Sequence, residues 1–241
     1  MKNIKTLSIV IPVYNEKATI GTVIRRVIEA DLGDINKEII VVNDGSNDGT
    51  KEELAKIVKT VKVPIMVIDQ VKNQGKSIAL RTGFEKVSGE VTVVQDGDLE
   101  YDPGDFKLML KKMGEDGVRV VYGSRQLGGR KNQYSGLSFY LGGQVLTWIT
   151  NLLYGANITD EPTCYKMFET KLLKSIKLES VRFEFCPEVT AKVSRMGEKI
   201  YEVPIKYNPR NKKQGKKIKL SDFWEAVWVL VKNRARKINE I

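Results

Sequence analysis

The sequence predicts an α/β protein with a mostly parallel central sheet and helices on both of its faces. Short β-branched, apolar segments alternate with segments in which apolar residues recur at the helical period. Alternation at this spacing is typical of βαβ units, in which a helix connects two parallel strands. With 241 residues the chain is long enough for one large domain with a substantial core.

The predicted elements follow one another along the chain. Strands are expected at residues 7–11, 38–42, 64–68, 91–95, 118–122 and 199–207. Helices are expected at residues 18–30, from about 50, at 76–87 and 104–113, within 132–159, near 171, from 183 to about 196, and at 221–236. We expect residues 1–219 to form the main domain and residues 220–241 to add an amphipathic, basic C-terminal helix to the same unit.

Composition limits the chemistry that this chain can perform. Its net charge of +10 favours an anionic partner, such as a nucleotide, a nucleic acid or a phospholipid surface. The absence of histidine excludes Ser-His-Asp and Cys-His catalysis and His-ligated zinc. Cys164 and Cys186 are far apart in the sequence, which argues against a disulfide framework or a zinc site and fits a reducing cytosol.

Two carboxylates lie one residue apart at the end of the fourth predicted strand. Asp96 and Asp98 flank Gly97, and like charges this close repel unless a cation lies between them or one is protonated. Gly97 permits a positive φ, so both side chains could turn towards one ion. Oxygen ligands suit Mg²⁺ or Mn²⁺. We interpret the motif as a metal and phosphate site, although an isolated Asp-X-Asp is also typical of a solvated acidic turn.

Two other predicted strand ends carry polar clusters, at residues 12–16 and 43–48. The carboxyl ends of parallel strands meet at one sheet edge, where ligands of open α/β sheets bind. Together with Asp96–Glu100, these clusters predict a nucleotide site. Asp44 resembles the acid that binds a ribose hydroxyl in dinucleotide folds, although the loop also fits a helix N-cap. The sequence contains neither the Walker motif nor the dinucleotide-binding glycine motif.

Three regions of the C-terminal half have two interpretations each. Residues 206–219 are rich in Lys and Arg without an acidic residue, which fits a solvated loop or a flap that grips phosphate. Residues 132–159 carry no charge and fit a core helix or a helix at a membrane interface. The C-terminal helix combines Trp224 and Trp228 with a basic end, which fits packing on the domain or anchoring on anionic lipid.

Taken in order, nine short motifs resemble those of family-2 glycosyltransferases with the GT-A fold, and most of all the dolichol- or polyprenyl-phosphate mannose synthases. The motifs are Pro12-Val-Tyr-Asn-Glu16, Asn43-Asp-Gly-Ser46, Asn73-Gln-Gly-Lys76, Asp96-Gly-Asp98, Gly123-Ser-Arg125, residues 160–168, Phe183-Glu-Phe185, Glu202-Val-Pro-Ile205 and Pro209-Arg210. Each motif is weak alone, but the ordered set is specific and spans nearly the whole chain. Residues 1–219 would then be the catalytic domain.

The resemblance implies roles for individual residues. Nucleotide-sugar binding is expected from Pro12, Tyr14, Glu16, Val42, Asp44, Asp96, Gly97, Asp98, Arg125, Arg210 and Lys216. Catalytic roles are expected for Asp96, Asp98, Arg125 and Asp160. The implied cofactor is Mg²⁺ or Mn²⁺, held by Asp96, Asp98 and Glu100; Glu100 is a departure, because mannose synthases commonly have Gln there. Candidates for the acceptor phosphate site are Arg130, Lys131 and Ser135.

The implied activity is metal-dependent, inverting transfer of a hexose onto a polyprenyl or dolichyl phosphate, with mannose from GDP-mannose as the first expectation. A phosphate acceptor is already anionic, whereas a sugar hydroxyl would need a carboxylate base, for which Asp160 and Glu161 are candidates. We expect a cytoplasmic protein, peripheral on the anionic inner face of a membrane.

Other function classes stay open. One is a family-2 transferase that uses a UDP-sugar, either glucose or N-acetylglucosamine, with a prenyl phosphate or a sugar hydroxyl as acceptor. Another is a non-catalytic protein that binds a nucleotide sugar. Nucleic acid is not an expected partner, because the basic residues lie in one loop and one helix without interleaved aromatic stacking positions.

Overall fold

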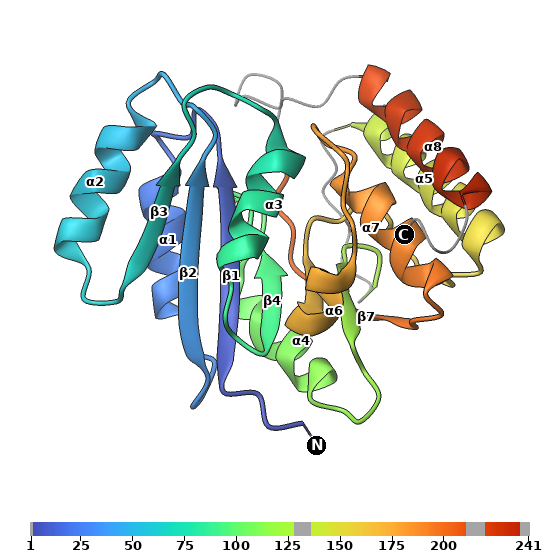
Figure 1. Cartoon of the computed structure of the whole chain (residues 1–241), viewed down its shortest axis with the longest axis horizontal. Coiled ribbons are helices and arrows are strands. Elements are labelled where there is room, and N and C mark those ends of the chain that lie inside the picture. The colour runs from blue at the N-terminus through green and yellow to red at the C-terminus, as the bar shows by residue number, and fades with distance from the viewer. Residues whose placement is uncertain (1, 128–135, 211–219, 237–241) are drawn as a thin grey trace.

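The computed structural model describes residues 2–127, 136–210 and 220–236 (Figure 1). Its strands are β1 (Thr6–Val13), β2 (Asn36–Asn43), β3 (Ile65–Asp69), β4 (Val91–Val94), β5 (Val120–Ser124), β6 (Lys166–Glu169) and β7 (Ile200–Pro204). Its helices are α1 (Ile20–Glu29), α2 (Thr50–Thr60), α3 (Lys76–Lys86), the 3₁₀ turn η1 (Pro103–Asp105), α4 (Phe106–Met113), α5 (Leu137–Tyr154), α6 (Thr170–Ser175), α7 (Phe185–Arg195) and α8 (Leu220–Ala235).

The strands form one sheet in the order β3-β2-β1-β4-β6-β5-β7. Parallel pairing joins β3, β2, β1 and β4, and also joins β5 to β7. In the described part of the chain only β6 runs antiparallel, between β4 and β5. The predicted α/β fold with a mostly parallel sheet is therefore confirmed. No strand was predicted at β6, which has only four residues and begins with a lysine.

Helices cover both faces of the sheet, because successive strand residues point to opposite sides. One core contains Leu7, Ile9 and Ile11 of β1 together with apolar residues of α1, α2 and α4. The opposite core contains Val10 of β1 together with apolar residues of α3, α6 and α7. In Figure 1, α1 lies behind the sheet and α3 in front of it.

The helices α5 and α8 form an additional layer that packs on α7, and they lie side by side at the right of Figure 1. Leu146 of α5, Ala191 of α7, and Ala226 and Leu230 of α8 form the small core between them. No helix in the described ranges combines the length and the apolar character needed to cross a bilayer.

Strand β1 is longer than predicted and includes Pro12, which was expected in a loop. The Val10 carbonyl accepts the amide of Gln95 just beyond β4, and Pro12, two residues on, faces the same side. Because β4 ends at Val94, no strand there requires the N–H that proline lacks. Proline is therefore compatible with the C-terminal end of β1.

Glu161, one of the two candidate bases, is fully buried between the sheet and the outer helices. Its backbone N–H donates to Thr147 of α5, and its carbonyl accepts from Lys166 of β6 (2.9 Å). Burial raises the pKa of Glu161 to about 8, and the positive charge of Lys166 opposes this shift only in part. The Glu161 side chain is therefore mostly protonated at neutral pH.

Glu161 should make folding stability pH-dependent. The folded chain keeps a proton that the unfolded chain releases near pH 4.5, so the free energy of unfolding should fall as pH rises from about 4.5 to about 8. Glu161→Gln should reduce this slope and stabilise the protein by on the order of a few kcal/mol at pH 8, since one pKa unit corresponds to about 1.4 kcal/mol. Urea unfolding across this pH range tests the effect. Glu85→Gln, at an exposed position of α3, is the control, and equal slopes for all three proteins would contradict the assignment.

Candidate functional site

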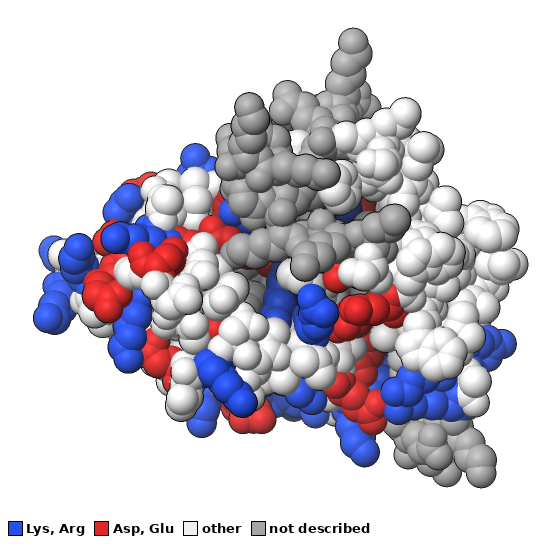
Figure 2. Space-filling view, turned by 90° about the horizontal axis from the view of Figure 1, so that it is seen from above, with Lys and Arg blue, Asp and Glu red and all other residues white. Residues whose placement is uncertain are grey.

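The three polar strand ends meet at one edge of the sheet, as predicted. β1 lies between β2 and β4, and all three strands run in the same direction. The loop after β1 is braced on the loop after β2: Asn15 N donates to Ser46 Oγ (2.9 Å), and Glu16 N donates to Thr50 Oγ1 (3.0 Å). Figure 2 looks down on the molecule from the side at which these strands end, and acidic and basic side chains mix near its middle.

Asp96 pairs with Lys76 at the start of α3. The Lys76 ammonium lies 2.6 Å from Asp96 Oδ1 and 3.2 Å from the sulfur of Cys164. Burial lowers the pKa of Lys76, but the Asp96 carboxylate and the sulfurs of Cys164 and Cys186 together raise it well above its ordinary value. Lys76 lies in one of the motifs of the sequence, but no role had been predicted for it. It is a permanent positive charge beneath the site.

Arg210 connects three other carboxylates of the site. Its guanidinium contacts Asp98 Oδ2 (2.7 Å) and Glu16 Oε2 (3.1 Å), and its backbone N–H donates to Glu100 Oε1 (2.8 Å). The hydroxyl of Tyr207 donates to the other oxygen of Glu100 (2.8 Å). The predicted nucleotide-binding residues Glu16 and Arg210 and the predicted metal ligands Asp98 and Glu100 therefore form a single ionic cluster.

Gly97 is required for packing and not for the positive φ that its sequence context suggested. Its φ lies outside the left-handed region, and a Cβ at this position would lie 2.9 Å from the Val13 side chain. The left-handed residue is Leu99 (φ 61°), an uncommon conformation for a side chain of this kind. Leu99 lies in the turn between Asp98 and Glu100, both of which contact Arg210.

The carboxylates fit a hard divalent cation by charge and ligand type. Burial, followed by the charges of Asp96 and Glu100, raises the pKa of Asp98 to about 7, and Arg210 opposes the shift. Nearby positive charge therefore favours ionised Asp98. Within the described ranges, no three acidic or thiol side chains already converge as a metal cage. Asp96 turns to Lys76, whereas Asp98 and Glu100 turn to Arg210.

Arg125 and Asp160, both predicted to be catalytic, form a buried bidentate ion pair beside this cluster. Arg125 Nε and Nη2 each lie 2.7 Å from one Asp160 oxygen, and the Arg125 backbone N–H donates to the same carboxylate (2.9 Å). Glu202 accepts the backbone amides of Thr159 and Asp160, which fixes this segment. The Arg125 guanidinium lies 4.9 Å from the ring centre of Tyr207 and so borders the Arg210 cluster.

The predicted nucleotide residues at the ends of β1 and β2 differ in accessibility. The Asp44 carboxylate accepts the amides of Gln74 (2.7 Å) and Gly75 (2.9 Å), and burial raises its pKa. Val42 is fully buried, with its side chain against α3, so that side chain is not at the surface. Pro12 and Tyr14 are half-buried at the end of β1. Their contact with a nucleotide stays a prediction.

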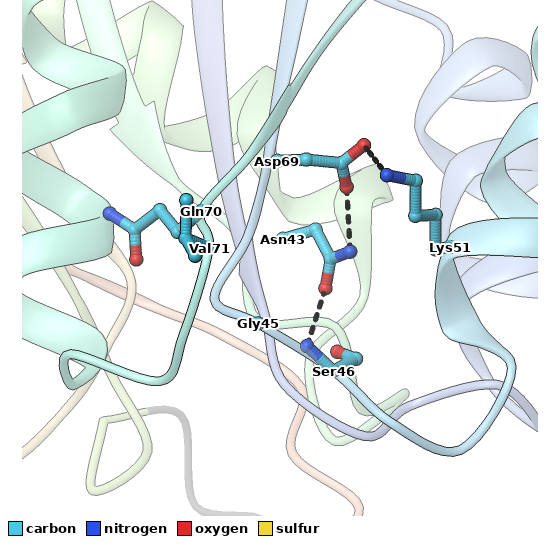
Figure 3. Close-up of a pocket in the computed structure, with 7 residues that line it drawn as sticks. All are labelled: Asn43, Gly45, Ser46, Lys51, Asp69, Gln70 and Val71. Atoms are coloured by element: carbon cyan, nitrogen blue, oxygen red, sulfur yellow. Dashed lines mark hydrogen bonds and ion pairs between the residues drawn. The ribbon is translucent and has the colours of Figure 1, made fainter.

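A hollow of about 290 Å³ adjoins the ends of β2 and β3. It is lined by Asn43, Gly45, Ser46, Lys51, Asp69, Gln70 and Val71. Asn43 bridges Asp69 (2.7 Å) and the Ser46 amide (3.2 Å), and Lys51 lies 3.2 Å from Asp69, whereas Gln70 points away from this chain of contacts (Figure 3). These contacts stabilise the loop that carries Asp44.

The predicted residues Lys216, Arg130, Lys131 and Ser135 lie outside the described residues. Tyr207, like Lys76, had no predicted role in the site. The sequence offers only a weak signal for Tyr207, which lies beside the basic run that contains Arg210. Its ring packs on Tyr101 (5.1 Å between ring centres), which in turn stacks on Tyr165 (4.5 Å). Tyr207 therefore connects Glu100 to this stack of aromatic rings.

Comparison with known proteins places this geometry in context. A dodecaprenyl-phosphate galacturonate synthase of Rhizobium johnstonii is 28% identical over 200 residues, which cover 80% of this chain and 57% of that protein. A dolichol-phosphate mannosyltransferase of Pyrococcus furiosus is 28% identical over 87% of this chain and 58% of its own length. The chain thus spans somewhat more than half the length of these relatives.

A solved structure supports the fold. Glucosyl-3-phosphoglycerate synthase of Mycobacterium tuberculosis, in complex with Mn²⁺, UDP and phosphoglyceric acid, superposes with a TM-score of 0.72 at 18% identity, covering 97% of this chain and 80% of that one. At this identity the similarity shows the GT-A architecture alone. Residues 8–176, most of the chain, match the family described as Glycosyl transferase family 2. The chain therefore belongs to Glycosyl transferase family 2.

Proposed function

We propose that this protein transfers a hexose from a nucleotide-diphosphate sugar to a polyprenyl phosphate, with inversion at the anomeric carbon. The two relatives described above, and a dolichyl-phosphate beta-glucosyltransferase of Trichomonas vaginalis, are named for different sugars but share a polyprenyl or dolichyl phosphate. This shared acceptor supports the acceptor class proposed here. Mannose from GDP-mannose is the donor that we would test first, with UDP-sugars as the alternative.

The observation that carries this proposal is the charged cluster at the sheet edge, where Asp96, Asp98 and Glu100 face Lys76 and Arg210. Asp98, with Asp96 and Glu100, would hold Mg²⁺ or Mn²⁺, which stabilises negative charge on a leaving diphosphate. Arg210 would add a positive charge to the same diphosphate. An acceptor phosphate oxygen then forms the bond to the anomeric carbon as the bond from that carbon to the diphosphate breaks.

The state of the two candidate bases favours a phosphate acceptor over a sugar hydroxyl. Both oxygens of Asp160 are engaged by Arg125, and the residue is 2% exposed. Glu161 is fully buried in the core. A hydroxyl acceptor would need a base within hydrogen-bond reach, whereas a phosphate monoester is already anionic near neutral pH.

Asp98→Ala should lower metal-dependent transfer by about 100-fold or more, because it removes one of the three carboxylates proposed to hold the metal. The assay pairs GDP-mannose, UDP-glucose and UDP-N-acetylglucosamine with a short polyprenyl phosphate and with simple sugar acceptors. Asp31→Ala is the matched control, since Asp31 is exposed and pairs with the exposed Lys107 instead of with the cluster. Undiminished transfer by Asp98→Ala would refute the metal role, and transfer to sugar hydroxyls alone would refute the acceptor class.

We also propose that the protein binds to a membrane surface through an apolar face on α5 and α8. This α5/α8 face consists of Leu137, Leu141, Val145, Trp148, Leu152, Trp224, Trp228 and Val231, all of which are exposed. Trp148 is 64% exposed, and Trp224 and Trp228 are each 65% exposed. A broad uncharged surface is visible at the right of Figure 2, on the side where α5 and α8 lie. Lys232 and Arg234 in the last turn of α8 would favour anionic lipid.

Replacing Trp224 and Trp228 with alanine should weaken binding to anionic vesicles by about 100-fold, because each tryptophan that leaves water for lipid contributes about 1.5 kcal/mol. Vesicle sedimentation with anionic and with neutral lipid measures the effect. Val71→Ala is the control. It removes an exposed apolar side chain just after β3, which is the edge strand at the other end of the sheet from β7. Equal retention of all variants on the vesicles would contradict the proposed surface.

A further inference from the structure

Arg210 lies between the carboxylates that a divalent cation would need. Its Nη2 is 2.7 Å from Asp98 Oδ2, and its Nε is 3.7 Å from Glu100 Oε1. A guanidinium and a divalent cation cannot occupy the space between these two carboxylates together, because both carry positive charge and both use the same oxygens. If Asp98 and Glu100 are to hold a metal, Arg210 has to find another partner.

Glu16 is a suitable anchor for Arg210 during such an exchange. Arg210 Nη1 lies 3.1 Å and 3.3 Å from the two Glu16 oxygens. Thr19 Oγ1 lies within hydrogen-bond distance of both Glu16 Oε2 (2.9 Å) and the Gly97 carbonyl (2.7 Å), which fixes Glu16 beside the Asp-Gly-Asp turn. Because a guanidinium carries five N–H groups, Arg210 can keep its bonds to Glu16 while its other donors change partner.

Lys76, the other positively charged side chain at the site, is not expected to exchange its partners. It stands at the first position of α3, where Ser77 N and Ser77 Oγ donate to the Arg182 carbonyl (2.8 Å and 2.7 Å) and fix the helix start. Its ammonium contacts Asp96 and Cys164. Arg210, in contrast, lies outside any helix or strand, after β7 has ended at Pro204. The two cations thus have different supports.

We propose that Arg210 is an exchangeable counterion of the metal site, and that Glu16 is the residue that positions it. In the ligand-free protein Arg210 neutralises Asp98 and Glu100. When the nucleotide sugar and the divalent cation bind, Arg210 releases these two carboxylates, which then bind the metal. Arg210 keeps its contact with Glu16 and turns its freed N–H groups to the diphosphate. This inference rests on the proposed function for its ligands, a divalent cation and a nucleoside diphosphate.

A thermodynamic consequence separates this arrangement from a merely structural ion pair. Metal binding alone must displace Arg210 without offering it a new partner, whereas a nucleoside diphosphate supplies that partner. The nucleotide should therefore raise the affinity for the metal, and by linkage the metal should raise the affinity for the nucleotide by the same factor. Arg210 is the side chain through which much of this coupling passes.

The test measures Mn²⁺ binding, with free Mn²⁺ followed by electron paramagnetic resonance, in the absence and presence of GDP or UDP. Arg210→Gln should bind Mn²⁺ alone about tenfold more tightly than the unmodified chain, and the enhancement by nucleotide should shrink by a similar factor. Arg210→Lys should show a smaller change, because an ammonium keeps the charge but cannot span the same carboxylates. Glu16→Gln should leave binding of Mn²⁺ alone within about twofold but should reduce the nucleotide enhancement.

Lys206→Gln is the matched control, since it removes one positive charge from the same segment. The Lys206 ammonium contacts Asp102 instead of the cluster. Equal Mn²⁺ affinity for Arg210→Gln and the unmodified chain would overturn the proposal, as would an equal gain for Lys206→Gln. Circular dichroism and thermal unfolding establish whether each variant is folded. If Arg210→Gln does not fold, the comparison of Arg210→Lys with the unmodified chain decides the test.

The binding test and the transferase assay fail independently. If the unmodified chain shows no transfer activity but shows the predicted coupling between Mn²⁺ and nucleotide binding, the proposed function is refuted and the exchange stands. Transfer activity without any difference in Mn²⁺ affinity between Arg210→Gln and the unmodified chain would refute the exchange and leave the function in place. Coupling that is unchanged in Glu16→Gln would refute the positioning role of Glu16 alone.

Discussion

The crowding of carboxylates at one sheet edge is the constraint around which the site is built. Glu16, Asp96, Asp98 and Glu100 come together because β1 and β4 are parallel neighbours whose carboxyl ends lie at the same edge of the sheet. Buried like charges are costly unless they are paired. The fold supplies Lys76 from the start of α3 and Arg210 from beyond β7. The aromatic rings of Tyr101, Tyr165 and Tyr207 pack on one another beside the cluster, which Tyr207 contacts through Glu100. A site so rich in negative charge suits ligands that bring cations with them.

The neighbouring Arg125–Asp160 pair shows how the same fold limits the chemistry. An aspartate near a glycosyl donor would be read from sequence alone as a base. Here its two oxygens are held by a guanidinium in bidentate geometry, and Glu202 fixes the backbone that carries it. Such a pair is better suited to holding the site in shape than to accepting a proton. The geometry therefore agrees with an acceptor that arrives already ionised.

The molecule also separates its charged site from its exposed apolar surface. The charged cluster belongs to the sheet, whereas the α5/α8 face belongs to helices that contact the rest of the protein mainly through α7. Apolar side chains on the outer sides of α5 and α8 are exposed, while Leu146, Ala226 and Leu230 on their inner sides are buried. A surface of this kind is typical of a docking face.

Local patterns in the sequence determined the order of strands and helices, the parallel character of the sheet and the meeting of three polar strand ends, because these follow from periodicity and from the direction of βαβ units. They did not reveal β6, which is too short for a periodic signal, or the burial of Glu161 and Val42. Nor could they place Arg210 against Glu16 and Asp98, which are about 194 and 112 positions away in sequence. The chain specified that Asp96-Gly-Asp98 would end a strand at a ligand-binding edge. Only the tertiary structure decided which cations face it, because contacts between such distant segments depend on how the whole chain packs.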